Sequence, residues 1–304
     1  MITPRGTFAT HRHPGSGAGP EPARLVIGSE GALGVITEAW MRVVPRPRWR
    51  ASASVAFTDF TSGVAAARAL VQSGLAPSNA RLLDGHEARL HRVRFDGKSV
   101  LLIGFESADH PLGAWRARAV ELATEHGGEV VAGPTEGEAS PEASRTGAAG
   151  TWRQAFLDAP YMQSALLSIG VVSDTFETAC TWTQFPELHA RVTAAVSRAL
   201  TEECGGGIVA CRFTHVYADG PAPYYTFVGA LSPGGELAQW RAIKAAASEA
   251  LAAAGGTITH HHAVGRVHRP WYDRERPALF GEALAAVKQK LDPRGILNPG
   301  VLVG

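Results

Sequence analysis

Cysteine, methionine and long apolar runs are all scarce in this chain of 304 residues. It contains 3 cysteines and 3 methionines, and an odd number of cysteines without CxxC spacing argues against a disulfide scaffold. Apolar runs such as Val100–Ile103 are far shorter than the ~20 residues that a membrane-spanning helix needs. The first residues also lack the apolar segment of a signal peptide. We therefore expect a cytoplasmic protein without a membrane span.

An excess of charge of either sign is absent as well. The chain has 29 Lys and Arg against 28 Asp and Glu, which leaves a formal net charge of +1. This balance gives no electrostatic reason to expect binding to nucleic acid or to an anionic membrane. With 45% hydrophobic residues, the chain can bury a substantial core as one large domain or two modest ones.

Apolar periodicity predicts a β-α-β-β-α-β order, typical of ferredoxin-like folds, followed by a second pass of similar order. The first pass comprises strands over 51–57, 80–83, 99–105 and 129–132 and helices over 61–72 and 111–126. The second comprises strands within 165–181 and over 208–216, 224–231 and 257–262 and helices over 185–203 and 236–253. A linker rich in Pro, Gly and Ser is expected over 133–150, and a last helix over 274–290. The fold class is therefore α+β, with helices on one side of a largely antiparallel sheet.

A glycine-rich turn follows the N-terminal segment. Residues 1–24 are rich in Pro, Gly, Arg and His, which predicts poor order, and residues 24–28 resemble a short buried strand. Gly28, Gly31 and Gly34 then allow a sharp turn whose backbone N–H groups can hold phosphate oxygens. A tight junction between two elements is the alternative, since the spacing does not fit GxGxxG or a P-loop.

Three consecutive histidines, His260, His261 and His262, stand out late in the chain. Each buried imidazole needs a hydrogen-bond partner, so a run of three is unusual for simple packing. Such a run suits acid/base chemistry or the binding of an anionic group. On a strand, His261 would face away from the other two unless the backbone bends. A solvated loop and a zinc site are the alternatives, but zinc ligands are usually spaced, so no metal site is assigned.

Four stretches resemble, in the same order, the FAD-linked oxidases of the vanillyl-alcohol-oxidase (FAD-binding type 4) superfamily. The branch that they resemble most is that of bacterial relatives of alkyldihydroxyacetonephosphate synthase. The stretches are 28–38, 174–178, 260–262 and 291–300. The resemblance implies FAD as the cofactor. It also implies a remnant of the FAD-binding domain over 1–47, a ferredoxin-like cap or substrate domain over 48–270, and a C-terminal helix and turn over 271–304 that return to the FAD side.

The resemblance also implies roles for individual residues. The implied cofactor-binding residues are Gly28, Ser29, Glu30, Gly31, Gly34, Val35, Ile36 and Asn298. The implied proton-transfer residues are Tyr224, His260, His261 and His262, and the implied substrate-binding residues are Gln163, His215, Tyr225 and Arg266. For Tyr225 a place in the hydrophobic core is an equal alternative.

Two departures from the family pattern affect the functional hypothesis. The long segment that usually precedes the glycine turn, and that holds most of the FAD, does not precede it here. Gln163 stands where synthase relatives carry an arginine, so the bidentate grip on a phosphate or carboxylate is lost. We expect a synthase-like FAD-linked oxidoreductase acting on a small molecule once a separate FAD-binding polypeptide completes it, with a homodimer left open. The alternatives are a non-catalytic truncated paralogue that binds a small ligand or a protein, and a metal-dependent hydrolase.

Overall fold

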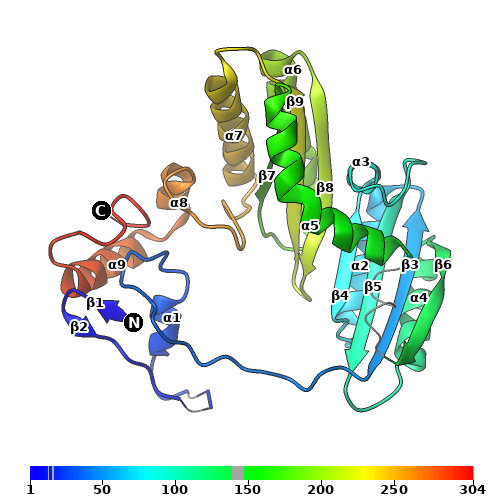
Figure 1. The fold of residues 1–304 in the computed structure, drawn as a ribbon, viewed down its shortest axis with the longest axis horizontal. Helices are drawn as coiled ribbons and strands as arrows, with labels where there is room; N and C mark the ends of the chain where they lie inside the picture. Colours follow the sequence, from blue (N-terminus) through cyan, green and yellow to red (C-terminus); the bar gives the residue numbers. More distant parts are fainter. Residues whose placement is uncertain (13, 16, 139–146, 304) are drawn as a thin grey trace. The chain divides into compact units, whose positions relative to one another are not determined.

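The computed structural model describes residues 1–12, 14–15, 17–138 and 147–303. The chain divides into two compact units (Figure 1). Unit 1 consists of Met1–Val44 together with Thr257–Gly304, and unit 2 is Pro45–Gly256. Within the described ranges, no helix combines the length and the apolar character needed to cross a bilayer.

Unit 2 is built on a seven-stranded sheet with the order β6-β3-β5-β4-β8-β9-β7. Every neighbouring pair of strands is antiparallel. The strands are β3 (Trp49–Phe57), β4 (Asn79–Leu83), β5 (Ser99–Ser107), β6 (Glu129–Glu138), β7 (Val171–Glu177), β8 (Gly207–Val216) and β9 (Pro221–Ala230). The expectation of an α+β fold with an antiparallel sheet is confirmed.

Alternation along the strands decides which helix covers which face of this sheet. Leu82 and Leu101 pack under α2 and α4, whereas their neighbours Leu83 and Val100 pack on the opposite face with Ala88 of α3. The core under α2 and α4 also includes α6, and α6 shares a second core with α7. The helices of unit 2 are α2 (Phe60–Gln72), α3 (Gly85–Leu90), α4 (Gly113–Glu125), α5 (Gly147–Ser168), α6 (Phe185–Cys204) and α7 (Glu236–Ala253).

Helix α2 shows why the secondary structure of this region could be predicted from the sequence. Asp59 caps it by accepting a hydrogen bond from the Ser62 N–H at 2.8 Å, and Ala66 and Leu70 are buried on one face. Just beyond the helix, Gly74 adopts a φ of 81°, which a residue with a side chain rarely takes. Cap, periodic apolar residues and terminal glycine therefore all point to the same element.

The two halves of the sheet meet along a narrow seam between β4 and β8. Only two residue pairs join these strands, Leu82 with Phe213 and Leu83 with Arg212. The Asp84 carboxylate extends the join by accepting a hydrogen bond from the Cys211 N–H. Aromatic side chains then close the core across the seam, with the rings of Phe60 and Phe213 5.6 Å apart.

Two expectations for unit 2 are wrong in detail. Residues 133–138, expected as linker, continue strand β6, and residues 147–150 open helix α5; the rest of that linker, 139–146, lies outside the described residues. Helix α5 was missed because its first turn is rich in Gly and Ala, and because Pro160 lies within it. The predicted strand over 257–262 is absent, so the second pass supplies three strands rather than four.

Unit 1 consists of short elements around a small apolar core formed by Leu33, Val264, Leu284 and Val301 to Val303. Its elements are β1 (Ile2–Thr3), β2 (Gly6–Thr7), α1 (Pro22–Val26), α8 (Arg269–Glu275) and α9 (Ala278–Leu291). The strand predicted over 24–28 is wrong because Glu21 caps a helix there and Pro22 occupies its first turn. The last predicted helix is two helices, which Pro277 separates.

Candidate functional site

The glycine turn of unit 1 has the backbone of an anion-binding loop. Gly28, Glu30 and Gly31 have φ angles of 84°, 51° and 74°, and among the described residues no acceptor is found for the N–H groups of Glu30 and Gly31. A Cβ at Gly28 would have nothing within 4 Å. Free donors beside open space are what an oxygen-rich anion such as a phosphate requires.

The same turn is anchored from below. Ala32 and Leu33 are each 1% exposed, and the Lys288 ammonium donates to the Ala32 carbonyl at 2.8 Å. Lys288 also pairs with Asp292 at 2.6 Å, and this pairing, with two backbone N–H donors, lowers the pKa of Asp292 against the opposing effect of burial. Gly34 packs so tightly that a Cβ there would lie 2.8 Å from the Ile2 carbonyl oxygen.

The side chains of the implied cofactor-binding residues differ in whether they are bonded within the protein, buried or exposed. The Glu30 carboxylate accepts hydrogen bonds from the N–H groups of Val264 and Gly265 at 2.8 and 2.9 Å, and the Asn298 amide donates to the Glu30 carbonyl at 2.5 Å. These two side chains are therefore engaged within the protein. Ser29 is buried, whereas Val35 and Ile36 are 58% and 56% exposed.

The histidine run lies on bent backbone rather than on a strand. The Thr259 hydroxyl donates to the His262 carbonyl at 3.1 Å, which closes the bend. Nδ1 of His260 and Nδ1 of His261 lie 3.3 Å apart, so in a hydrogen bond one must carry the proton that the other accepts. The rings of His261 and His262 are 4.5 Å apart. The bend thus brings together side chains that a straight strand would have separated.

Arg266, expected to bind substrate, lies just beyond this run in unit 1. Its guanidinium donates to the Pro299 carbonyl at 2.9 Å. It therefore ties the segment after the histidines to the C-terminal turn that also carries Asn298. Unit 1 brings together the glycine turn, the histidine run and these two residues.

Tyr224, in β9 of unit 2, is placed between a hydroxyl and a cation. Its hydroxyl donates to Thr175 Oγ1 on β7 at 2.8 Å, and the Arg212 guanidinium lies over its ring, 3.8 Å from the centroid. Arg212 in turn forms a buried ion pair with Glu87. A half-buried phenol in this setting is held in one orientation, which suits proton transfer.

Tyr225, its neighbour, points into the core and is fully buried. Its ring stacks on Phe176 at 5.0 Å, and its hydroxyl lies 3.1 Å from His189 Nδ1. Burial raises the pKa of Tyr225 well above its ordinary value and lowers the pKa of His189 to about 4. The structure thus gives Tyr225 the core position that was its alternative.

Gln163 and His215 occupy two different places in unit 2. Gln163 on α5 donates to the Ser173 carbonyl at 3.1 Å and lines a cavity of about 430 Å³ whose wall includes Leu167 and Trp240. Trp240 Nε1 donates to Asp174 at 2.7 Å in the same wall. His215 is exposed on β8, beside an irregularity in the pairing with β9.

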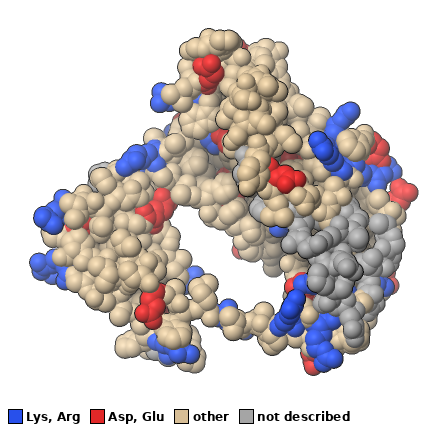
Figure 2. Space-filling model, in the orientation of Figure 1, with Lys and Arg blue, Asp and Glu red and all other residues tan. Residues whose placement is uncertain are grey.

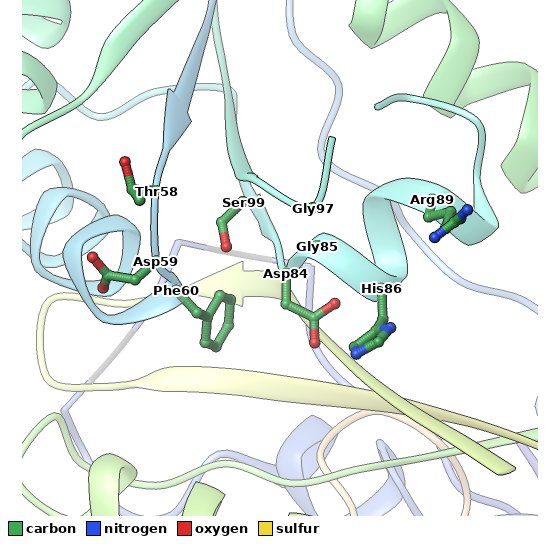
Figure 3. A pocket seen from close by; sticks show the side chains of 9 residues that line it. All are labelled: Thr58, Asp59, Phe60, Asp84, Gly85, His86, Arg89, Gly97 and Ser99. Carbon is green, nitrogen blue, oxygen red and sulfur yellow. The ribbon is translucent and has the colours of Figure 1, made fainter. Parts of the chain in front are cut away.

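A second cavity of unit 2, of about 270 Å³, was not anticipated from the sequence (Figure 3). Asp84, His86, Arg89 and Ser99 contribute polar groups to it. Burial raises the pKa of Asp84 to about 7, although two backbone N–H groups donate to its carboxylate. The one signal in the sequence was a polar Asp-Gly-His segment directly after a buried strand.

Charged side chains do not gather by sign on the visible surface. On the face drawn in Figure 2, Lys and Arg are scattered among Asp and Glu, with uncharged residues between them. This distribution agrees with the near-zero net charge.

Comparison with known families decides the assignment of the chain. Residues 46–302 match the model of FAD linked oxidases, C-terminal domain. The chain belongs to the FAD-linked oxidase family. The family match and the relatives confirm the predicted likeness to a FAD-linked, synthase-like flavoprotein with FAD as the family's cofactor, and they do not favour the alternative of a non-catalytic truncated paralogue.

Relatives of this oxidase-family chain include synthases and bacterial oxidoreductases. Alkyldihydroxyacetonephosphate synthase of Dictyostelium discoideum is 25% identical over 99% of the chain and 52% of that protein. The uncharacterized FAD-linked oxidoreductase YgcU of Escherichia coli is 25% identical over 95% of the chain and 59% of that protein. The chain therefore spans about half the length of the curated relatives that it matches.

Two solved structures share the fold of the chain. A structure of alkyldihydroxyacetonephosphate synthase superposes with a TM-score of 0.69 at 21% identity, covering 98% of the chain and 51% of that protein. A 4-ethylphenol oxidase from Gulosibacter chungangensis gives a TM-score of 0.56 at 13% identity over 86% of the chain and 55% of that protein. At these identities the likeness establishes the fold alone.

The glycine turn fits part of a FAD molecule. The N–H groups of Glu30 and Gly31 lack acceptors within the described chain, and the space at Gly28 is open, so the turn can accept pyrophosphate oxygens. The exposed apolar side chains of Val35 and Ile36 follow directly.

Proposed function

We propose that this chain is the substrate-domain and C-terminal part of a FAD-linked oxidoreductase related to alkyldihydroxyacetonephosphate synthase, and that it acts when a FAD-binding portion completes it. The observation that carries the proposal is the glycine turn. Its N–H groups at Glu30 and Gly31 have no acceptor among the described residues, and the Glu30 carboxylate is bonded to Val264 and Gly265, just after the histidine run.

The chemistry that FAD supplies when bound is the acceptance and return of an electron pair. The residues of this chain would bind the substrate and move protons. The Tyr224 hydroxyl, oriented by Thr175 and Arg212, is the proposed proton-transfer group of unit 2. The linked imidazoles of His260 and His261 are the proposed group of unit 1, since an imidazole nitrogen can donate or accept a proton through such a contact.

The substrate class follows in part from Gln163. Its amide is neutral and already donates to the Ser173 carbonyl, so it offers no cation to a phosphate or carboxylate. The cavity beside it is walled by Leu167, Leu231 and Trp240. An acyl-glycerone phosphate is therefore disfavoured, and we propose a small oxygenated substrate, with aromatic alcohols and 2-hydroxy acids as the candidates.

The completing portion is proposed to pack on the extended segment 35–44. This segment precedes the region that matches the C-terminal family domain and carries a row of exposed apolar side chains. They are Val35, Ile36, Trp40, Met41, Val43 and Val44. Exposed apolar side chains in a contiguous segment mark an interaction site more often than a solvated surface.

The cytoplasm is the proposed compartment. Cys180, Cys204 and Cys211 are all free thiols, and burial raises the pKa of each of them. Thiols of this kind stay reduced and unreactive in a reducing environment. Expression with separate cytoplasmic and exported fusions, followed by thiol labelling, would test the assignment.

Flavin retention tests the proposal directly. The purified chain is mixed with FAD, desalted and examined for flavin absorbance, first alone and then with a FAD-binding polypeptide taken from a neighbouring reading frame or from a synthase relative. We expect flavin to be retained only in the mixture of both polypeptides. Retention by neither the chain nor the mixture would contradict the proposal.

A matched pair of glycine variants localises the contact. Gly28 and Gly19 have φ angles of 84° and 86°, and a Cβ at either would have nothing within 4 Å. Alanine is therefore equally strained at both positions, but only Gly28 belongs to the proposed cradle. We expect Gly28→Ala to weaken flavin retention by about tenfold or more, the order of one lost strong contact, and Gly19→Ala to leave it unchanged.

A further inference from the structure

Glu30 makes more connections than any role in cofactor binding requires. Its two carboxylate oxygens accept separate hydrogen bonds, from Val264 N at 2.8 Å and from Gly265 N at 2.9 Å. Its carbonyl oxygen accepts a third from the Asn298 amide. One residue of the glycine turn thus holds the segment that follows His262 and the C-terminal turn.

The backbone of Glu30 takes a conformation that a residue with a side chain rarely adopts. Its φ is 51°, a region that costs a residue with a side chain about 1 kcal/mol or more. Gly28 and Gly31 take similar angles in the same turn without that cost. A glycine would therefore serve the turn better, unless the side chain itself is needed.

The two N–H groups that Glu30 receives fix the geometry of the bend. Val264 is 8% exposed and packs in the core of unit 1, and Gly265 has a φ of 54°. A carboxylate that accepts from two successive N–H groups sets the direction in which the chain leaves His262. On the other side of the run, the Thr259 hydroxyl holds the His262 carbonyl.

We propose that Glu30 is a positioning residue that orients His260, His261 and His262 from the cofactor turn, rather than a residue that contacts the cofactor through its side chain. Its relevance to catalysis rests on the function proposed above. We call the two hydrogen bonds from Val264 N and Gly265 N to the Glu30 carboxylate the clamp. The clamp lies within unit 1 and can be measured without a flavin. If the clamp couples the two segments, a ligand of the turn and a ligand of the histidine run change each other's affinity by the same factor.

A purely structural role is the rival explanation, and unit 1 already has a scaffold of that kind. Lys288 joins Asp292 and the carbonyls of Ala32 and Leu297 beneath the turn. If Glu30 has only a structural role, its loss lowers the unfolding free energy of the whole unit. If Glu30 positions the histidines, its loss first changes the conformation of the bend and the orientation of the imidazole rings. A measurement at these residues, together with the unfolding free energy, therefore separates the two roles.

Three variants of the full chain provide the test. Glu30→Gln removes the charge and one of the two acceptors, and Glu30→Asp keeps the charge but shortens the reach by one methylene. Glu282→Gln is the control, because Glu282 is an exposed glutamate on α9. Amide hydrogen exchange of Val264 and Gly265 and the ¹⁵N imidazole spectra of His260 to His262 are recorded, with urea unfolding as the global measure.

We expect Glu30→Gln to speed exchange at both amides by about tenfold or more, as the loss of a charge-assisted hydrogen bond requires, and to shift the imidazole signals. Glu30→Asp should restore part of both effects, and Glu282→Gln should match the wild type. Unchanged exchange and unchanged imidazole spectra in Glu30→Gln would overturn the proposal.

Two further results bear on the proposal: failure of the Glu30→Gln variant to fold, and failure of the chain to retain flavin. If Glu30→Gln fails to fold, the wild type decides, because the clamp requires Val264 and Gly265 N–H to exchange more slowly than the amide of Gly31, for which the described part of the chain offers no acceptor. Equal rates would overturn the clamp. A confirmed clamp in a chain that never retains flavin, even with its partner, would instead remove the proposed function and leave the clamp standing.

Discussion

The two units of the chain are stabilised by different kinds of contact. Unit 2 buries large aromatic side chains together with titratable groups, among them Tyr225, Cys211 and Glu87. Unit 1 has a small apolar core and is held by charged side chains that bond to backbone, as Glu30 and Lys288 do. Unit 2 thus has the core of an independent domain, whereas unit 1 depends on a few directed contacts.

The exposed apolar residues sharpen this contrast. In unit 1 they are concentrated in segment 35–44, where Met41 is 79% and Val43 is 86% exposed. A segment of this kind gains stability only when another surface covers it. Unit 1 therefore leaves a contiguous row of exposed apolar side chains over residues 35–44 for a partner to cover.

The largest effect is expected from Lys288→Met, which removes the buried ammonium beneath the glycine turn. Asp292, 1% exposed, would lose its countercharge, and two carbonyls would lose their donor. Breaking one side of a buried pair costs about 3 to 5 kcal/mol. Hydrogen exchange should show unit 1 opening while the strands of unit 2 keep their protection.

Lys290→Met is the control for that experiment, because Lys290 is exposed on the same helix. Its effect on unit 1 should stay within about 0.5 kcal/mol. Equal destabilisation of both units by Lys288→Met would show that they unfold together, and the contrast between them would fall.

A pH-dependent effect of similar size is expected in unit 2. Burial lowers the pKa of His189 from 6.5 to about 4, so the stability that neutral His189 contributes is complete above pH 6.5 and is lost as pH falls toward 4. Burial raises the pKa of Asp84 from 3.8 to about 7, so its contribution is complete below pH 3.8 and is lost as pH rises through 7. The two slopes oppose each other between pH 4 and 6.5.

Asp84→Asn should expose the histidine slope. Unfolding free energies of the variant and the wild type, measured by urea titration from pH 4 to 7, should diverge by roughly 3 kcal/mol, from 1.36 kcal/mol per pKa unit. The variant should gain stability relative to the wild type as pH rises. Parallel curves would mean that Asp84 ionises normally and that the cavity of Figure 3 is better hydrated than its burial indicates.

A smaller effect is expected from Phe213→Leu at the seam of unit 2. Phe213 is fully buried between Phe185 and Trp182, and the smaller side chain should cost about 1.5 kcal/mol. Thermal unfolding followed by tryptophan fluorescence gives the value, with the exposed Ile208→Val as control. Exchange at Val264 and Gly265 in unit 1 should be unaffected, and a change there would show that the units are coupled.

The smallest effect on the chain itself is expected from the double variant Met41→Ser and Val43→Ser. Both side chains are exposed, so the unfolding free energy should change by less than about 0.5 kcal/mol. Binding to a FAD-binding polypeptide, followed by calorimetry, should weaken by about tenfold or more if these residues lie at the centre of the interface. The exposed Phe95→Ser in unit 2 is the matched control, and equal weakening by both would refute the proposed surface.

The sequence predicted the elements in which several local signals agree. Helix α6 has apolar periodicity throughout and ends at Gly205, whose φ is 70°, and its predicted range was nearly correct. The strand predicted over 257–262 is wrong. Its β-branched residues suggested a strand, whereas a hydrogen bond from the Thr259 hydroxyl to the His262 carbonyl stabilises a bend. Local propensity gives way where a side chain offers the backbone another partner.

The site was only partly visible for a different reason. The glycine turn and the histidine run could each be named from their own residues, but the bond between Glu30 and Val264 joins positions 234 residues apart. The cavity around Asp84 likewise depends on Cys211 from the other half of the sheet. Contacts of this separation leave no periodicity in a single sequence, so neither could have been predicted from it.

The narrow seam between β4 and β8 has a mechanical consequence. With two residue pairs, the Asp84 bridge and a few aromatic rings across it, it has the fewest paired residues among the described strand pairs of the sheet. We therefore expect a pulling force applied to the outer edges of the sheet to part the halves there first. If the sheet yields at the seam between β4 and β8, its two halves can rotate relative to each other about that line. The curvature of the sheet then changes at the seam, while the strand register within each half is kept.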